Sequence, residues 1–172
     1  LNDFHLNVAG EYVYDGALYA CQNDDAKQRR SKRAVWGMAA ILTVAVAAGG
    51  CIPAPGMQNC FYVLLPYLGE FLGAASVIWA LAKLGMDWGT VREYNYKKSV
   101  AVLPVRTAVT AVFSGLGIVC ELIFFFVNDH AGQTFFALLY VLLKLIALLS
   151  VLVLRAEIMQ AEWDKLPKKD NS

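Results

Sequence analysis

Glu70, Glu121 and Lys144 are ionisable residues that lie inside long apolar stretches of the 172-residue sequence. Counted from the ends of those stretches at about 1.5 Å per helical residue, Glu70 and Lys144 lie roughly 15 Å deep and Glu121 roughly 10 Å deep. In a bilayer, an isolated charge at such a depth costs on the order of 3 kcal/mol or more, so these residues usually face a helix-bundle interior and pair. We therefore expect a buried ion pair between Glu70 and Lys144, with Glu121 either protonated or joined to the pair.

The neighbours of these residues suit an interior position, because small or polar side chains recur on the same helix faces. Gly69 and Gly73 are four positions apart beside Glu70, a spacing that lets helices approach closely. The other residues expected on these faces are Ser114 and Gly117 beside Glu121, and Tyr140 and Ala147 beside Lys144. Two carboxylates that share one ammonium could bind a proton, which is one interpretation of the cluster. An ion pair that only fixes the helix register is the other, and we favour it.

Cys51 and Cys60 bracket a short connection that is rich in proline and glycine. If this connection faces an oxidising compartment, the two residues are candidates for a structural disulfide. A redox-active pair is the alternative, but the spacing is not C-x-x-C. The remaining cysteines, Cys21 and Cys120, are expected in a polar segment and inside an apolar stretch, and so do not form a second pair.

Other arrangements that carry chemistry are missing from the sequence. Asp129 and His130 supply two metal ligands at most, whereas zinc sites use three or four. The sequence holds no phosphate-binding glycine loop and no hydrolase or metalloprotease motif. We therefore expect no catalytic residue, metal or cofactor, and the net charge of +1 gives no indication of nucleic-acid binding.

The apolar stretches that contain these residues are long enough to cross a membrane. The chain is 58% hydrophobic and only 17% charged, with a mean hydropathy of +0.49. A span needs about 20 apolar residues for about 30 Å of hydrocarbon, and its backbone must be helical. The windows that qualify are residues 34–52, 61–84, 103–127 and 134–154. The sequence therefore predicts an all-α integral membrane protein with four transmembrane helices in a bundle.

The basic residues are segregated along the chain. All of the fifteen Lys and Arg residues except Lys144 fall before the first window, around the connection between the second and third, or after the fourth. Because such residues are retained in the cytoplasm, both termini are expected inside. Leu1 in place of Met is what a bacterial TTG start codon or a trimmed chain would give, so we expect a bacterial plasma membrane. The residues expected to contact anionic lipid head groups are Arg29, Arg30, Lys32, Arg33, Lys97 and Lys98.

The segments outside the spans are a cytosolic N-terminal segment, residues 1–33, and a C-terminal segment, residues 155–172. The N-terminal segment is polar, so no cleavable signal peptide is expected. Within it, residues 11–20 resemble a short hairpin with a turn at Asp15-Gly16, although an irregular or helical segment fits nearly as well. Apolar residues after Leu154 recur at helical spacing, so the fourth helix is expected to continue until Pro167.

Faint self-similarity relates the two halves of the chain. The stretches FYVLLPYLGE and FFALLYVLLK open the second and fourth windows, and their alignment places Glu70 on Lys144. This suggests two parallel helical hairpins, although chance similarity between leucine-rich segments is the simpler explanation.

These features favour a small, non-catalytic structural or accessory component of a membrane assembly. The expected partners are the lipid bilayer and either further copies of the chain or a larger membrane complex that docks on the cytosolic face. A small oligomeric transporter or proton-linked permease that uses Glu70, Glu121 and Lys144 is the alternative. A membrane thiol-redox or lipid-modifying enzyme is a second alternative.

Overall fold

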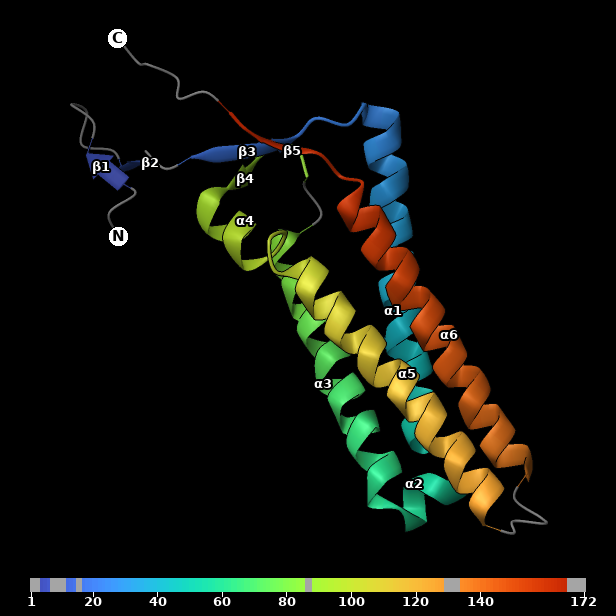
Figure 1. The fold of residues 1–172 in the computed structure, drawn as a ribbon. Coiled ribbons are helices and arrows are strands. Elements are labelled where there is room, and N and C mark those ends of the chain that lie inside the picture. Colours follow the sequence, from blue (N-terminus) through green and yellow to red (C-terminus); the bar gives the residue numbers. More distant parts are fainter. Residues whose placement is uncertain (1–3, 7–11, 15–16, 86–87, 129–133, 167–172) are drawn as a thin grey trace.

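Four long antiparallel helices dominate the computed structural model, which describes residues 4–6, 12–14, 17–85, 88–128 and 134–166. The helices follow the chain order α1 (Asp25–Cys51), α3 (Phe61–Leu84), α5 (Leu103–Val127) and α6 (Thr134–Met159) (Figure 1). Each is long and apolar enough to cross a membrane. The prediction of four apolar helices of spanning length is therefore confirmed.

The helices extend beyond the predicted windows where the residues at their ends are charged, because charged residues lower the local hydropathy even when they are helical. Helices α3 and α5 cover the predicted residues 61–84 and 103–127. Helix α1 begins earlier, at Asp25, because Lys, Arg and Gln are good helix formers even though they are not membrane-embedded. Helix α6 continues past Leu154 and ends at Met159.

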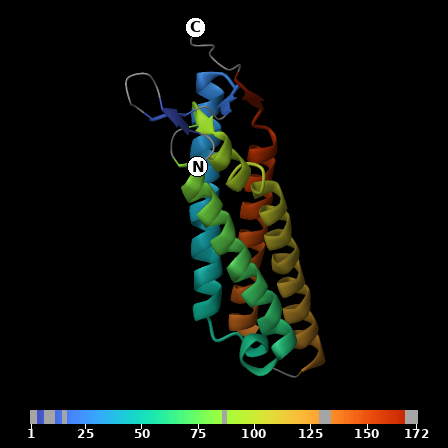
Figure 2. The ribbon, with the colours of Figure 1, turned by 90° about the vertical axis from the view of Figure 1, so that its left-hand side faces the viewer.

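The four helices form a ring in the order α1, α3, α5, α6 (Figure 2). Helix α1 packs mainly against α6, and α5 packs against both α3 and α6. The contact between α1 and α3 is the least extensive of the ring, and the short helix α2 (Pro55–Asn59) connects the two helices in the chain. The arrangement does not test the suggested duplication into two parallel helical hairpins, which stays a prediction. Helices α3 and α6 lie at diagonally opposite positions and run in the same direction (Figure 1).

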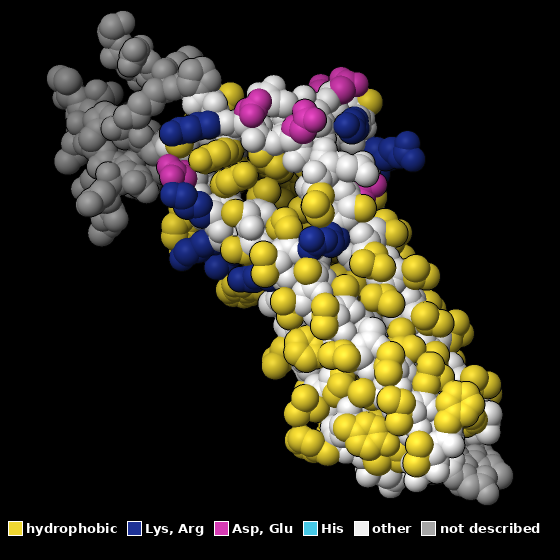
Figure 3. All heavy atoms as spheres, in the orientation of Figure 1, with side chains coloured by type: hydrophobic (Ala, Val, Ile, Leu, Met, Phe, Trp, Pro, Cys, Tyr) yellow, Lys and Arg dark blue, Asp and Glu magenta, His cyan; other side chains and the backbone are white. Residues whose placement is uncertain are grey.

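Small residues let α3 approach α5 closely, as the sequence predicted. A Cβ added to Gly69 would lie 2.5 Å from the ring of Phe113, and one added to Gly73 would lie 2.6 Å from Thr110 Oγ1. At both positions a Cβ would force the neighbouring side chain on α5 to shift, so glycine permits the close approach. The outer faces of the helices carry large apolar side chains along most of the bundle (Figure 3).

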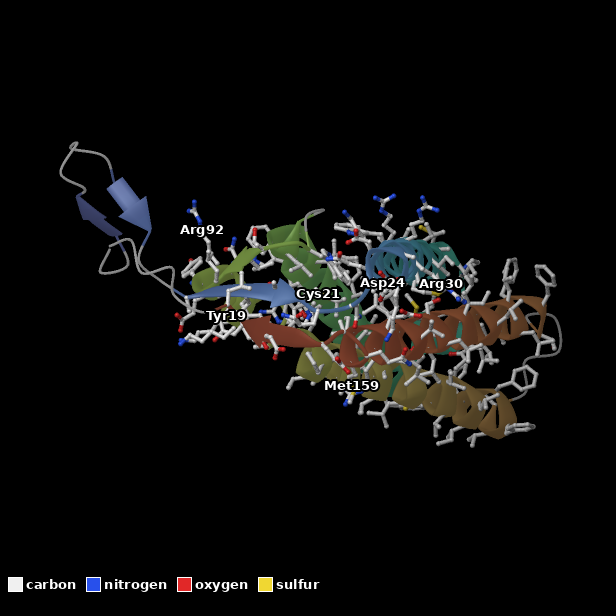
Figure 4. All side chains as sticks on the ribbon, turned by 90° about the horizontal axis from the view of Figure 1, so that it is seen from above. Tyr19, Cys21, Asp24, Arg30, Arg92 and Met159 are labelled. Carbon is white, nitrogen blue, oxygen red and sulfur yellow. The ribbon has the colours of Figure 1, made fainter. Side chains whose placement is uncertain are left out.

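One end of the bundle carries a small three-stranded sheet, and we call it the sheet end. Its central strand, β3 (Leu18–Cys21), is antiparallel to β4 (Val91–Arg92) on one side and to β5 (Trp163–Lys165) on the other. Figure 4 looks down on this end, with Tyr19 and Cys21 on β3 and Arg92 on β4. The sheet thus joins the N-terminal segment, the middle connection and the C-terminal segment.

The sheet corrects two predictions about the terminal segments. The C-terminal helix ends at Met159 and does not reach Pro167, and the chain from Trp163 to Lys165 pairs with β3 instead. The predicted hairpin across Asp15-Gly16 is also wrong in its pairing, and that turn lies outside the described residues. Strand β2 (Tyr12–Tyr14) pairs with β1 (Phe4–Leu6) instead.

Aromatic side chains fasten the sheet to the bundle. Tyr19 on β3 stacks on Tyr96 of the short helix α4 (Glu93–Lys98), with ring centres 4.1 Å apart. Trp163 on β5 lies 6.1 Å from Tyr96 and 6.2 Å from Trp88. Trp88 is buried in a core cluster that continues into α1, α3 and α6. The sheet is therefore packed on the bundle core.

The opposite end, which we call the α2 end, is closed by α2. Pro55 occupies the first turn of α2, where its missing N–H is not needed, and both Pro55 and Gly56 are buried. Helix α2 contacts α5 and α6 as well as α3. It therefore covers the bundle interior at this end.

Candidate functional site

The candidate site lies near the middle of the bundle, where three helices each turn one polar side chain inward. Glu70 belongs to the buried stripe of α3, Ser114 to that of α5 and Lys144 to that of α6. Within each stripe the buried residues recur every three or four positions, as expected for one face of a helix. Helix periodicity therefore brings residues far apart in the sequence to one point on the bundle axis.

Glu70 and Lys144 form an ion pair that crosses the diagonal of the bundle. Lys144 Nζ donates to Glu70 Oε2, and the Glu70 and Lys144 side chains are 0% and 2% exposed. Ser114 Oγ donates to the other carboxylate oxygen, Glu70 Oε1, over 2.7 Å. The pairing predicted from the depth of the two residues is present, and Ser114 extends it to a third helix.

Two tyrosine rings enclose the ammonium group. Lys144 Nζ lies 4.6 Å from the ring centre of Tyr67 on α3 and 5.1 Å from that of Tyr140 on α6. The electron-rich ring faces attract a cation without supplying a second negative charge. The Tyr67 hydroxyl points to the carbonyl oxygen of Val46 on α1, 3.4 Å away. All four long helices therefore contribute to the surroundings of Lys144.

The side chain of Lys144 lies beside Gly117 on α5. A Cβ at this position would lie 3.6 Å from Lys144 Cε and 3.7 Å from Nζ. The lysine stem therefore rests on the backbone of α5 one helical turn from Ser114. One turn further toward the α2 end, the same stripe carries Glu121.

Glu121 is fully buried, but it differs from Glu70 in its partners. Neither of its carboxylate oxygens has a hydrogen-bond partner among the described residues. Helix α2 covers it closely, because a Cβ added to Gly56 would lie 2.2 Å from Glu121 Oε2. The Tyr140 hydroxyl is also buried without a partner among the described residues. Two unpaired polar groups thus lie on the α2 side of the ion pair.

The structure gives no support to the predicted disulfide. Cys51 and Cys60 are free thiols, as are Cys21 and Cys120. Helix α2 occupies the chain between Cys51 and Cys60, and Cys51 faces the outside of the bundle. Because the sequence pattern shows only spacing, it could not indicate that a helix separates the two thiols.

The residues predicted to contact lipid head groups are at or near the sheet end. Arg29, Lys32 and Arg33 line a shallow hollow of about 240 Å³ together with Trp36. Arg30, labelled in Figure 4, lines a neighbouring hollow of about 540 Å³. Lys97 and Lys98 on α4 are exposed, but their ammonium groups bind Glu93 and Tyr94 within the same helix. The α1 cluster is therefore better placed than α4 for a head group.

Metal coordination has no candidate site in the described part of the chain. No group of three or more His, Cys, Asp or Glu side chains gathers there. Asp129 and His130 lie outside the described residues.

Sequence reasoning missed two contributors to the site. Tyr67 lies one helical turn from Glu70 on α3. An aromatic residue in an apolar helix gives no indication in the sequence that it contacts a cation. Gly56 lies in a Pro/Gly-rich connection that the sequence predicts as a turn, whereas the structure places it in the first turn of α2.

No family model matches the sequence, and no curated protein or solved structure matches the chain. The residues that indicate a role are therefore those that the fold itself brings together. They form a neutral, well-packed ion pair and, beside it, a buried carboxyl group without a partner.

Proposed function

We propose that the chain is a small, non-catalytic component of a membrane assembly that binds a partner protein through its sheet end. The observation that carries this proposal is the three-stranded sheet, in which β3, β4 and β5 come from three widely separated segments. A loop that only connects two spans needs no such ordering. An ordered platform outside the spans is what a protein partner requires.

The distribution of charge supports a cytoplasmic sheet end. Lys and Arg side chains gather at this end of the bundle, whereas the lower part of the visible face is apolar (Figure 3). Retention of basic residues in the cytoplasm would place the sheet, both termini and any partner on that side. The expected location remains a bacterial plasma membrane.

The central ion pair supports a scaffold role. Glu70, Lys144 and Ser114 bind one another across three helices in a site with little exposure. Such a contact restricts the register and rotation of α3, α5 and α6. A rigid bundle would hold the sheet at a fixed distance from the membrane.

Site-specific photo-crosslinking in native membranes tests the proposal. A photoreactive amino acid at Asp164, which is exposed on β5, should give one discrete protein adduct. The matched control is Gln58, which is exposed on α2, and it should give lipid adducts only. An adduct at twice the chain mass would identify a second copy as the partner. The absence of any protein adduct at Asp164 would contradict the proposal.

Thiol labelling in whole cells tests the orientation. With single-cysteine variants, a membrane-impermeant maleimide should label Cys51 in intact cells, because this exposed residue lies at the α2 end. Cys21 on β3 should react only after permeabilisation. The reverse pattern would place the sheet outside and remove the cytoplasmic docking site.

A small proton-linked permease is the second candidate, and the unpaired Glu121 carboxyl group favours it. Reconstituted protein would then carry a flux driven by a pH gradient. The flux should be lost in Glu70→Gln and Glu121→Gln but retained in Glu93→Gln, which alters an exposed carboxylate on α4.

A further inference from the structure

The charge balance of the bundle interior leaves Glu121 without a counterion. Lys144 is the buried cation of the site, and its ammonium donates to Glu70, which also accepts from Ser114. If Glu121 were also ionised, the interior would carry a net negative charge. An isolated carboxylate in an apolar medium costs so much that such a group takes up a proton instead.

Among the described residues, the surroundings of Glu121 supply no second cation that could act as a counterion for a carboxylate. The titratable groups that interact electrostatically with Glu121 are Lys144 and Tyr140 on α6 and Tyr62 on α3. Helix α2 covers Glu121 at Gly56, whose backbone lies within hydrogen-bonding reach of the carboxyl group, and the ring of Phe124 on α5 also lies beside Gly56. One backbone N–H does not neutralise a buried charge. None of these neighbours except Lys144 is a cation, and Lys144 is already paired.

We propose that Glu121 is a proton-binding site, and that Glu70 and Glu121 share one proton and one ammonium group. With Lys144 on Glu70, Glu121 is a neutral carboxylic acid. When this proton moves from Glu121 to Glu70, the Lys144 ammonium becomes the counterion of the Glu121 carboxylate. One proton and one ammonium group are present before and after the transfer, so the interior stays neutral. The ligand of this site is thus a proton, and the position of the Lys144 ammonium group determines which of the two carboxyl groups is protonated.

The position of Lys144 makes this exchange possible. Its stem lies along Gly117, between the levels of Ser114 and Glu121 on α5. A rotation of the terminal bonds of the lysine would therefore turn the ammonium from one carboxyl group toward the other. The inference goes beyond the proposed function, because a structural component needs no group that binds a proton.

Infrared spectroscopy of the purified protein at neutral pH tests the site directly. The carbonyl band of a protonated carboxylic acid should be present in the full chain and lost in Glu121→Gln. Glu93→Gln should leave this band unchanged, because Glu93 is exposed and paired with Lys97. If Glu121→Gln folds and the band is unchanged, or if the full chain shows no such band, the proposal is wrong.

Glu70→Gln tests the shared proton. With Gln at position 70, Lys144 has only Glu121 as an anionic partner, so the acid band should disappear although Glu121 itself is intact. A protonated Glu121 in this variant would contradict the exchange, even if the full chain shows the band.

Labelling with dicyclohexylcarbodiimide gives an independent readout. This apolar reagent adds to a protonated carboxyl group, whose proton moves to a reagent nitrogen, and rearranges to a stable N-acylurea that retains the full mass of the reagent. Mass spectrometry should find one adduct on the peptide that contains Glu121, reduced to background in Glu121→Gln and in Glu70→Gln. An adduct on Glu70 in the full chain would reverse the assignment. These outcomes do not depend on whether a partner binds at the sheet end.

Discussion

Two Glu–Lys ion pairs of the described residues have the same chemistry and opposite surroundings. Glu70 and Lys144 meet across the bundle from helices α3 and α6, with almost no exposure. Glu93 and Lys97 are one turn apart on α4, and Lys97 Nζ lies 2.6 Å from Glu93 Oε1. The exposed fraction of the side chain is 67% for the lysine and 33% for the glutamate. The first pair joins distant segments, whereas the second reinforces a helix that exists without it.

The comparison shows that geometry alone does not determine what an ion pair contributes. When an exposed pair breaks, water replaces each partner, so such pairs contribute little. When one partner of a buried pair is removed, the other remains charged in an apolar site. The buried pair therefore restricts which arrangements of the helices are possible.

Lys144→Met should have the largest effect. Removal of the ammonium leaves Glu70 without a counterion, and such a change typically costs about 3–5 kcal/mol. The loss should appear as a lower thermal unfolding temperature in detergent. The matched control is Lys97→Met on α4, which should unfold like the original chain. Equal unfolding temperatures for the two variants would remove the distinction between the pairs.

The double variant Glu70→Met with Lys144→Met should recover much of that loss. Once both charges are absent, no buried charge is left without a partner, and replacement by apolar residues of similar volume is often neutral. The double variant should therefore be more stable than Lys144→Met alone in the same unfolding assay. A double variant as unstable as the sum of the two single changes would mean that the residues act independently.

Gly56→Ala should have an intermediate effect. Its Cβ would meet Glu121 Oε2 at 2.2 Å, so α2 or the carboxyl group must move. Overpacking of this kind costs about 1–3 kcal/mol. Glu121→Ala should rescue the variant in the same unfolding measurement, because it removes the atoms that clash. If Glu121→Ala does not restore the stability of Gly56→Ala, the strain arises from another contact of α2.

Glu93→Gln should have the smallest effect, with an unfolding temperature close to that of the original chain at pH 7. The hydrogen bond and the positive charge of Lys97 lower the pKa of Glu93. A lowered pKa in the folded state contributes stability that is present above the ordinary glutamate pKa and lost as the pH falls through the folded value. Any difference between the two proteins should therefore shrink in acid, and also in high salt. A difference that grows on acidification would contradict this sign.

The sequence alone predicted the parts of the fold that depend on local pattern. The windows 61–84 and 103–127 coincide with α3 and α5, because hydropathy and helix length decide them. The contact between Glu70 and Lys144 followed from equal depth and opposite charge. Ser114 was placed on the right face but not recognised as a donor to Glu70, because the distance between helices is not encoded in one helix.

The parts that could not be predicted depend on long-range contact. Strand β5 is three residues long and carries no strand pattern of its own. Its conformation is decided by pairing with β3 and by the packing of Trp163 against Trp88 and Tyr96. The burial of Glu121 under α2 has the same origin, since only the folded chain brings Gly56 to it.

The sheet also sets the order of events during synthesis. Strand β3 leaves the ribosome before any of the four spans, but one of its neighbours, β5, emerges only after all four. One edge of β3 therefore stays unpaired until β5 has been synthesised. A chain that stalls or is cut before residue 163 has its spans but not its finished sheet. In such a fragment the edge of β3 that pairs with β5 lacks its neighbouring strand, and an unpaired strand edge is prone to pair with another chain.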